Sequence, residues 1–70
     1  MIELTDLPAI GSGIEIVKVN ETLMMGTLVH VIEDAGQLKA IGLQDITGAM
    51  YWMDPADVAY IRPFRVGPLP

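Results

Sequence analysis

Cysteine is absent from this chain of 70 residues, and histidine occurs only once. Without cysteine the chain forms neither disulfide bonds nor a thiolate metal site, and one histidine is too few for a histidine-rich zinc cluster. Basic residues are scarce as well, because four lysines and arginines stand against nine acidic residues and give a formal net charge of −5. Proteins bind nucleic acid largely through cationic side chains, so this charge argues against a general binder of polyanions.

Long apolar runs are also missing. The longest uncharged stretch in the first half of the chain spans residues 22–32, and polar residues and a glycine interrupt it. A membrane-spanning helix needs about 20 mainly apolar residues, so we expect no contact with a membrane. The first ten residues carry two acids and no basic cluster. No export signal is therefore predicted, and we expect a cytoplasmic protein.

Apolar residues make up 51% of the chain and charged residues 19%, a composition that excludes intrinsic disorder. A chain of this length buries only roughly 60–65% of the surface of its unfolded state, so a core of its own is marginal. We therefore expect a tightly packed barrel that also self-associates. The sequence has no internal repeat and no interior linker, which predicts an N-terminal arm (residues 1–13), one barrel domain (residues 14–64) and a C-terminal tail (residues 65–70).

Short segments rich in β-branched residues alternate with turn residues along the chain. They predict five strands: residues 14–19, 23–33, 38–43 and 49–53, and a short fifth strand that ends at Arg62-Pro63. The expected fold class is therefore all-β.

Glycine and proline define how these strands are connected. Gly26 lies inside the long second segment and predicts a bulge or a bend at which the sheet curls. Asp54 before Pro55 is typical of a capped helix start, but the β-branched residues that follow limit it to one 3₁₀ turn. The expected architecture is a small five-stranded barrel with a 3₁₀ turn before the last strand.

Four motifs follow one another between Gly26 and Pro63. They open the bent strand, form the apolar third strand, begin the fourth and form the closing strand: Gly26-x-Leu28, residues 38–43, Met50-Tyr51 and Asp57-Val58-Ala59-Tyr60-Ile61-x-Pro63. This order resembles the Sm-like pattern of the bacterial RNA chaperones. The resemblance implies a small SH3-like or Sm-like barrel that assembles into a ring.

The chain departs from that family where the family contacts RNA. The tyrosine-lysine-histidine segment with which the bacterial chaperones contact uridine-rich RNA falls on Asp54-Pro55-Ala56 in this sequence. An acid and a proline stand there in place of a stacking ring and cations, and the amphipathic N-terminal helix of the family is not evident over residues 1–13. The resemblance therefore supports a ring-forming barrel more than RNA binding.

Two pairs of acids, Glu33 with Asp34 and Asp54 with Asp57, have a spacing that could hold a hard cation such as magnesium or calcium. Neighbouring acids in a hairpin loop are usually a solvated turn, and Asp54 is better explained as a helix cap. We therefore predict no metal site.

A nucleophilic triad would have to combine Ser12, His30 and an acid, and nothing in the sequence positions them together. Ser12 lies between Gly11 and Gly13, but the lysine and helix start that a phosphate loop requires do not follow. We therefore predict that the protein is not an enzyme and uses no cofactor.

Both parities of the second predicted strand are apolar. Residues of one parity alternate with residues of the other: Met24, Leu28 and Ile32 with Leu23, Met25, Val29 and Val31. An antiparallel sheet with one face in water shows a cleaner alternation, so something is expected to cover the second face. Either the N-terminal arm or another subunit does so. We favour a homo-oligomer, with these predicted interface residues: Met24, Met25, Val29 and Val31.

Aromatic and arginine residues gather towards the end of the chain. Tyr51 and Trp52 are successive strand residues, so they point to opposite faces and at least one of them is available for contact. Tyr60 and Arg62 share one face of the closing strand, and Arg65 follows shortly after it. Rings stack on bases and arginines grip phosphates, so the predicted ligand-binding residues are Tyr51, Trp52, Tyr60, Arg62 and Arg65.

Two functions remain open from the sequence. The first is a non-enzymatic, self-assembling barrel that binds a small anionic ligand, a nucleotide or a short oligonucleotide, at subunit interfaces, as a phage or bacterial regulator that sequesters a signal. The second is an acidic protein-interaction module or inhibitor that docks on a partner protein. The clustered arginines favour the first unless they pair with Asp54 and Asp57, and the net acidity favours the second. We expect no binding to double-stranded nucleic acid.

Overall fold

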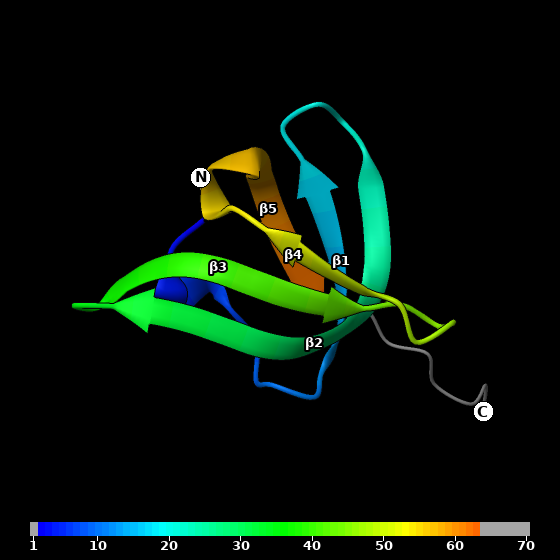
Figure 1. Ribbon diagram of the computed structural model, residues 1–70. Coiled ribbons are helices and arrows are strands. Elements are labelled where there is room, and N and C mark those ends of the chain that lie inside the picture. The colour runs from blue at the N-terminus through cyan, green and yellow to red at the C-terminus, as the bar shows by residue number, and fades with distance from the viewer. Residues whose placement is uncertain (1, 64–70) are drawn as a thin grey trace.

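Residues 2–63 are described by the computed structural model of the chain, and they form an all-β domain (Figure 1). Its elements are η1 (Leu4–Asp6), β1 (Gly13–Lys18), β2 (Leu23–Asp34), β3 (Gln37–Gln44), β4 (Met50–Met53), η2 (Pro55–Asp57) and β5 (Val58–Pro63). The five predicted strands and the 3₁₀ turn before the last one are confirmed, and η1 adds a turn that the sequence did not predict. No helix in this part of the chain is long and apolar enough to cross a membrane.

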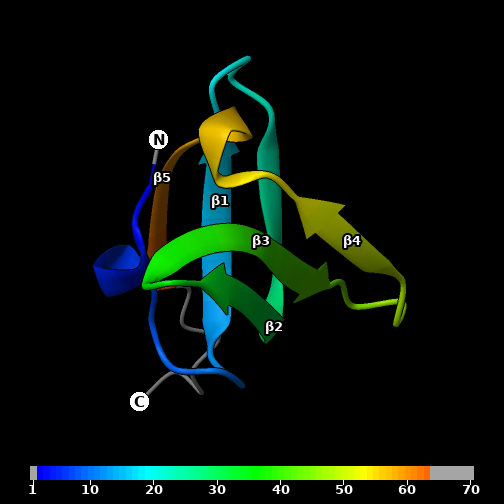
Figure 2. The same cartoon turned by 60° about the vertical axis from the view of Figure 1, so that its left-hand side comes forward.

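The strands of these residues form one antiparallel sheet in the order β4-β3-β2-β1-β5. β2 is long enough to pair twice, with β1 near its beginning and with β3 along the rest. The sheet curls along this strand, so β3 passes in front of β1 in Figure 2. β4 and β5 are the two ends of the sheet, and hydrogen bonds between described residues do not join them.

Gly26 lies where β2 leaves β1 and joins β3. A Cβ atom at this position would lie less than 3.0 Å from the Gln44 carbonyl oxygen and 3.1 Å from Leu43 Cδ1. Real Cβ atoms do not approach a backbone oxygen so closely, so only glycine allows the end of β3 to lie against β2 here. This close approach lies where the sequence predicted the curl.

A β-bulge at Val29 explains part of the apolar pattern on both parities of β2. The register with β3 shifts between Leu28 and His30, so Val29 is the inserted residue. One extra residue reverses which side chains point inwards. Leu28 is buried and Met24 packs against the core before the bulge, and Val31 packs against it after the bulge. Two of the four predicted interface residues, Met24 and Val31, thus contact the core of their own chain.

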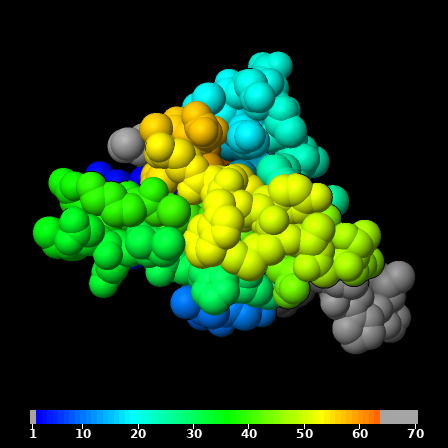
Figure 3. Space-filling model, viewed as in Figure 1, coloured from blue at the N-terminus to red at the C-terminus, as the bar shows by residue number. Residues whose placement is uncertain are grey.

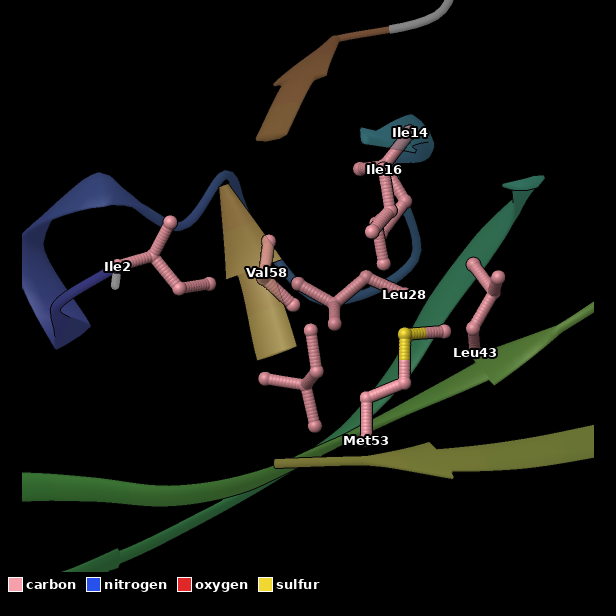
Figure 4. Close-up of a cluster of buried hydrophobic side chains, with 8 residues drawn as sticks. Ile2, Ile14, Ile16, Leu28, Leu43, Met53 and Val58 are labelled. Carbon is pink, nitrogen blue, oxygen red and sulfur yellow. The ribbon is translucent and has the colours of Figure 1, made fainter. Parts of the chain in front are cut away.

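The core is an apolar cluster enclosed by the curled sheet (Figure 4). Among residues 2–63, the largest fully buried side chains are Ile14, Ile16, Leu28, Ile41, Leu43 and Val58. Burying a side chain of this kind contributes about 1.5–3 kcal/mol relative to leaving it exposed. Ile2 is only 5% exposed and lies beside Val58, so the N-terminal arm contributes a residue to the core.

η2 connects the two end strands of the sheet along the chain. The Asp54 carboxylate accepts a hydrogen bond from the Ala56 N–H at 2.9 Å, and Pro55 occupies the first turn. The Asp57 carbonyl accepts a hydrogen bond from the Val19 N–H at 2.9 Å, which ties the turn to the end of β1. The predicted cap at Asp54 is confirmed, and η2 fixes where β5 begins.

Candidate functional site

The predicted ligand-binding residues lie at the two ends of the sheet rather than together. Tyr51 and Trp52 belong to β4, and Tyr60 and Arg62 belong to β5. Three strands separate β4 from β5 in the sheet order. Arg65 lies outside the described residues. The structure therefore offers two candidate surfaces, one around Trp52 and one around Arg62.

Trp52 lies across β3 and stacks on His30. The ring centroids are 5.6 Å apart and the ring planes differ by 18°. Gly42 lies between them, because it pairs with His30 on one side and with Trp52 on the other. A Cβ atom at Gly42 would lie 3.1 Å from His30 Cβ, and 3.4 Å from both Trp52 Cζ3 and Met50 Cε. The missing side chain at Gly42 lets these three side chains close over the strand.

These side chains remain open to solvent although they cover Gly42. Trp52 is 53% exposed and Met50 39%, and Ile32, which follows His30 on the same side of β2, is 47% exposed. Figure 3 shows yellow atoms of β4 on the surface, beside green atoms of β2 and β3. We name His30, Ile32, Met50 and Trp52 the Trp52 surface. Tryptophan and methionine are enriched in protein interfaces, so its composition is typical of a contact surface.

The turn between β3 and β4 holds Asp45 as a local hydrogen-bond acceptor. Its carboxylate accepts hydrogen bonds from the Thr47 hydroxyl at 2.6 Å, the Thr47 N–H at 2.9 Å and the Ala49 N–H at 3.1 Å. The Thr47 hydroxyl is the main cause that lowers the pKa of Asp45, desolvation opposes it, and the Tyr51 hydroxyl adds to the lowering. The Asp45 carboxylate thus stabilises its own turn. Tyr51 is 42% exposed, so both aromatic residues of β4 face solvent.

Arg62 on β5 contacts two neighbours. Its guanidinium carbon lies 5.7 Å from the centroid of the Tyr60 ring, as expected for residues that share one side of a strand. Its Nε and Nη2 also contact Oε1 of Glu15, the residue directly opposite on β1. The partner of Arg62 is therefore Glu15, and the alternative pairing with Asp54 or Asp57 is wrong for this residue. The Glu15 side chain is only 13% exposed, so Arg62 shields it from water.

Apolar side chains surround this ion pair on the outer side of β1. Val17 lies between Tyr60 on β5 and Leu23 on β2, and Met25 lies opposite Glu15. Tyr60 is 47% exposed, Leu23 53% and Met25 46%. We name Val17, Leu23, Met25 and Tyr60 the β1 face. Met25 is the one predicted interface residue that the structure leaves exposed.

Two hollows in the described part of the chain are candidates for a small ligand. One, of about 570 Å³, lies between residues 2–5, residues 36–39 and Asp54. Its charged groups are two carboxylates and one ammonium group, so it repels an anion. The other, of about 400 Å³, is lined by Gly13 and by residues 25–27 and 44–46. Neither hollow is lined by the predicted ligand-binding residues that the structure describes.

Within residues 2–63, no group of three or more histidine, aspartate or glutamate side chains lies close enough together to hold a metal ion. No protein-family model, curated protein or solved structure matches the chain. The resemblance to Sm-like barrels therefore stays an expectation, and the two surfaces are the basis for a functional proposal.

Sequence reasoning missed His30 as the partner of Trp52 and Glu15 as the partner of Arg62. Both contacts join different strands and depend on the register between them. A signal did exist for the first contact. Gly42 interrupts an apolar strand, and a glycine inside a strand often marks a close approach of another group.

Proposed function

We propose that this protein is a non-enzymatic binding module that works as a homo-oligomer, with its copies joined through the β1 face. The observation that carries the proposal is the composition of that face. Four apolar side chains surround an arginine whose charge is already paired with Glu15. Exposed apolar patches with polar groups beside them are typical of surfaces that contact other proteins.

The charge of the β1 face is compatible with a second copy as its occupant, and the apolar area favours it. Each chain carries a formal net charge of −5, so two copies repel each other over most of their surfaces. The ion pair on the β1 face adds little to this repulsion, because Arg62 neutralises Glu15 within the same chain. Packing this face against another copy removes apolar area from water, which contributes about 25 cal/mol per Å².

The position of the single histidine supports a binding role rather than catalysis. A histidine that activates a nucleophile is hydrogen-bonded to it and is oriented by an acid. The ring of His30 is instead stacked on Trp52 at the outer side of the sheet. The residues beside it, Gly42 and Trp52, offer neither a nucleophile nor an acid.

A small anionic ligand at the subunit interface is the second candidate, and the contact of Tyr60 with Arg62 favours it. A ring beside a guanidinium suits a base and a phosphate. The Arg62 side chain is 58% exposed, but a phosphate would have to compete with Glu15 for the guanidinium. Because of this competition, we favour self-assembly over anion binding as the proposed function.

Native mass spectrometry and light scattering at micromolar concentration test the assembly. We expect more than one copy of the 7.6 kDa chain in each particle. Leu23→Glu should return the protein to the monomer, because it places an unpaired carboxylate in the β1 face.

Ile32→Glu is the matched control for this experiment. Ile32 lies on the same strand as Leu23 and is exposed to a similar extent, but it belongs to the Trp52 surface. This variant should keep the oligomer. A monomeric wild-type protein would contradict the proposal, and so would an oligomer that survives Leu23→Glu.

A further inference from the structure

β4 is an edge of the sheet that carries part of the Trp52 surface. It pairs with β3 through four residues, and in the part of the chain that the structure describes no strand lies along its other edge. Edge strands in natural proteins are protected from pairing by being very short, or by a lysine, a proline or an inward-pointing charge. β4 is short, with four residues, so any added strand pairs over a short length. The strand Met50–Met53 contains no lysine, proline or charged residue. An extended segment of another chain can therefore add to β4 through main-chain hydrogen bonds.

The chain on both sides of β4 is acidic. Residues 45–57 contain three acids, Asp45, Asp54 and Asp57, and no lysine or arginine. The hydrogen bonds of Asp45 lower its pKa, so its carboxylate is charged at neutral pH. The strand is thus flanked by negative charge, which attracts a cationic partner and repels a phosphate.

The basic residues that the structure describes offset this negative charge only in part. Lys18 lies on β1, and Arg62 on β5 is paired with Glu15. Lys39 donates a hydrogen bond to Gln37 at 3.4 Å and lines a hollow together with Asp54, so it offsets one of the three acids and leaves the other two. A second copy of the chain brings the same excess of acid, so its charge fits β4 less well than that of a basic segment.

Trp52 supplies the side-chain contact that suits such a segment. Part of its ring lies against Gly42, and 53% of the residue is still open to solvent. Tryptophan is the side chain over which a guanidinium stacks best. The stacking of His30 on Trp52 holds the indole in place before a partner arrives, which lowers the entropy cost of binding.

We infer that the Trp52 surface and the free edge of β4 bind an extended, arginine-containing segment of a partner protein. One arginine stacks on Trp52, and the backbone of the segment adds to β4 as a further strand. The inference rests on the proposed role as a binding module. It uses a different surface from the β1 face, so the two proposals can fail separately.

The test uses a synthetic peptide of alternating valine and arginine, and a second peptide with glutamate in place of arginine. Trp52 is the only tryptophan of the chain, so its fluorescence reports on this surface directly. Adding the arginine peptide should change the Trp52 emission until it reaches a plateau at saturating peptide. Raising the salt concentration should weaken this binding severalfold. The glutamate peptide should leave the emission unchanged.

Two further measurements separate the parts of the contact, with fluorescence anisotropy of a labelled arginine peptide as the readout. Trp52→Ala should weaken binding at least tenfold. Tyr60→Ala, which removes a ring of similar exposure from the β1 face, should leave binding unchanged. Alternate amides of an extended peptide point to opposite edges, so only one set can donate hydrogen bonds to β4. N-methylation of that set keeps the arginines but blocks strand addition, and should weaken binding at least tenfold. N-methylation of the other set should not.

Equal binding of the arginine and glutamate peptides, or full binding to Trp52→Ala, overturns the inference. Uridine-rich RNA that binds wild type and not Trp52→Ala would assign the surface to nucleic acid instead. If wild type does not bind the peptide and Trp52→Ala loses the oligomer, the Trp52 surface would be assigned to a second copy. A monomeric protein that binds the arginine peptide through Trp52 would leave this inference standing and remove the proposed assembly.

Discussion

Alanine at Gly26 is the most direct test of how the sheet is bent. The added Cβ atom would lie less than 3.0 Å from the Gln44 carbonyl oxygen, and this backbone atom moves only if β3 separates from β2. Overpacking costs typically 1–3 kcal/mol, and a clash with backbone places Gly26→Ala at about 3 kcal/mol. In a domain of this size 1 kcal/mol corresponds to about 4–8 °C, so Tm should fall by roughly 12–24 °C.

Gly42→Ala is the matched control, because it adds the same methyl group to the neighbouring strand. The nearest atoms there belong to side chains, His30 Cβ at 3.1 Å and Trp52 Cζ3 and Met50 Cε at 3.4 Å. Only the contact with His30 Cβ is tighter than an ordinary van der Waals contact, and β2 must move there by a few tenths of an ångström, which is far less than the clash at Gly26 requires. The cost should therefore stay near about 1 kcal/mol. This variant should instead change the fluorescence of Trp52.

Thermal unfolding followed by circular dichroism compares the two variants. All samples need one protein concentration, because the Tm of an oligomer depends on concentration. If Gly26→Ala melts within a few degrees of wild type, or no lower than Gly42→Ala, the close approach of β3 to β2 at Gly26 is refuted.

The remaining predictions concern a turn, an ion pair and RNA. Asp45→Ala should destabilise the protein to urea more at pH 7 than at pH 2, because folding lowers the pKa of Asp45: its contribution is fully present above the usual value of 3.8 and is lost as the pH falls through the folded value. An equal loss at both pH values would show that the ionised carboxylate does not hold the turn. Arg62→Ala should cost about 1 kcal/mol or less, since the arginine is largely exposed, and adding Glu15→Gln should recover part of the loss. A double variant without recovery would mean that the two side chains do not interact in solution. Uridine-rich and adenine-rich RNA should bind weakly at physiological salt because of the net charge of −5; submicromolar binding with a steep salt dependence in a filter or anisotropy assay would prove this wrong.

Local signals located the elements of the fold. The first four predicted strands begin and end within one residue of the observed ones. Runs of β-branched residues and the turn residues between them act over a few positions, so they can be read from the sequence without knowing the sheet. The same holds for η2, whose start is specified by Asp54 and Pro55.

The candidate site was harder to predict because it depends on the register between strands. The bulge at Val29 decides which side chains of β2 point inwards, and it exists only in the pairing with β3. Glu15 and Arg62 are 47 positions apart in the chain and meet because β5 pairs with β1. The burial of Ile2 likewise depends on where the arm meets the finished core.

The order of strands in the sheet has a consequence for how the chain folds. β1, β2, β3 and β4 each pair with their neighbours along the chain, and in the described sheet only the pairing of β1 with β5 joins distant segments. Closing so long a loop costs more chain entropy than closing a hairpin, so we expect β5 to dock last. Pulse-labelled hydrogen exchange should then protect the amides of β2 and β3 before those of β5. The β1 face includes Tyr60 of β5 and is complete only at that final step, so partly folded chains lack the surface through which finished ones associate.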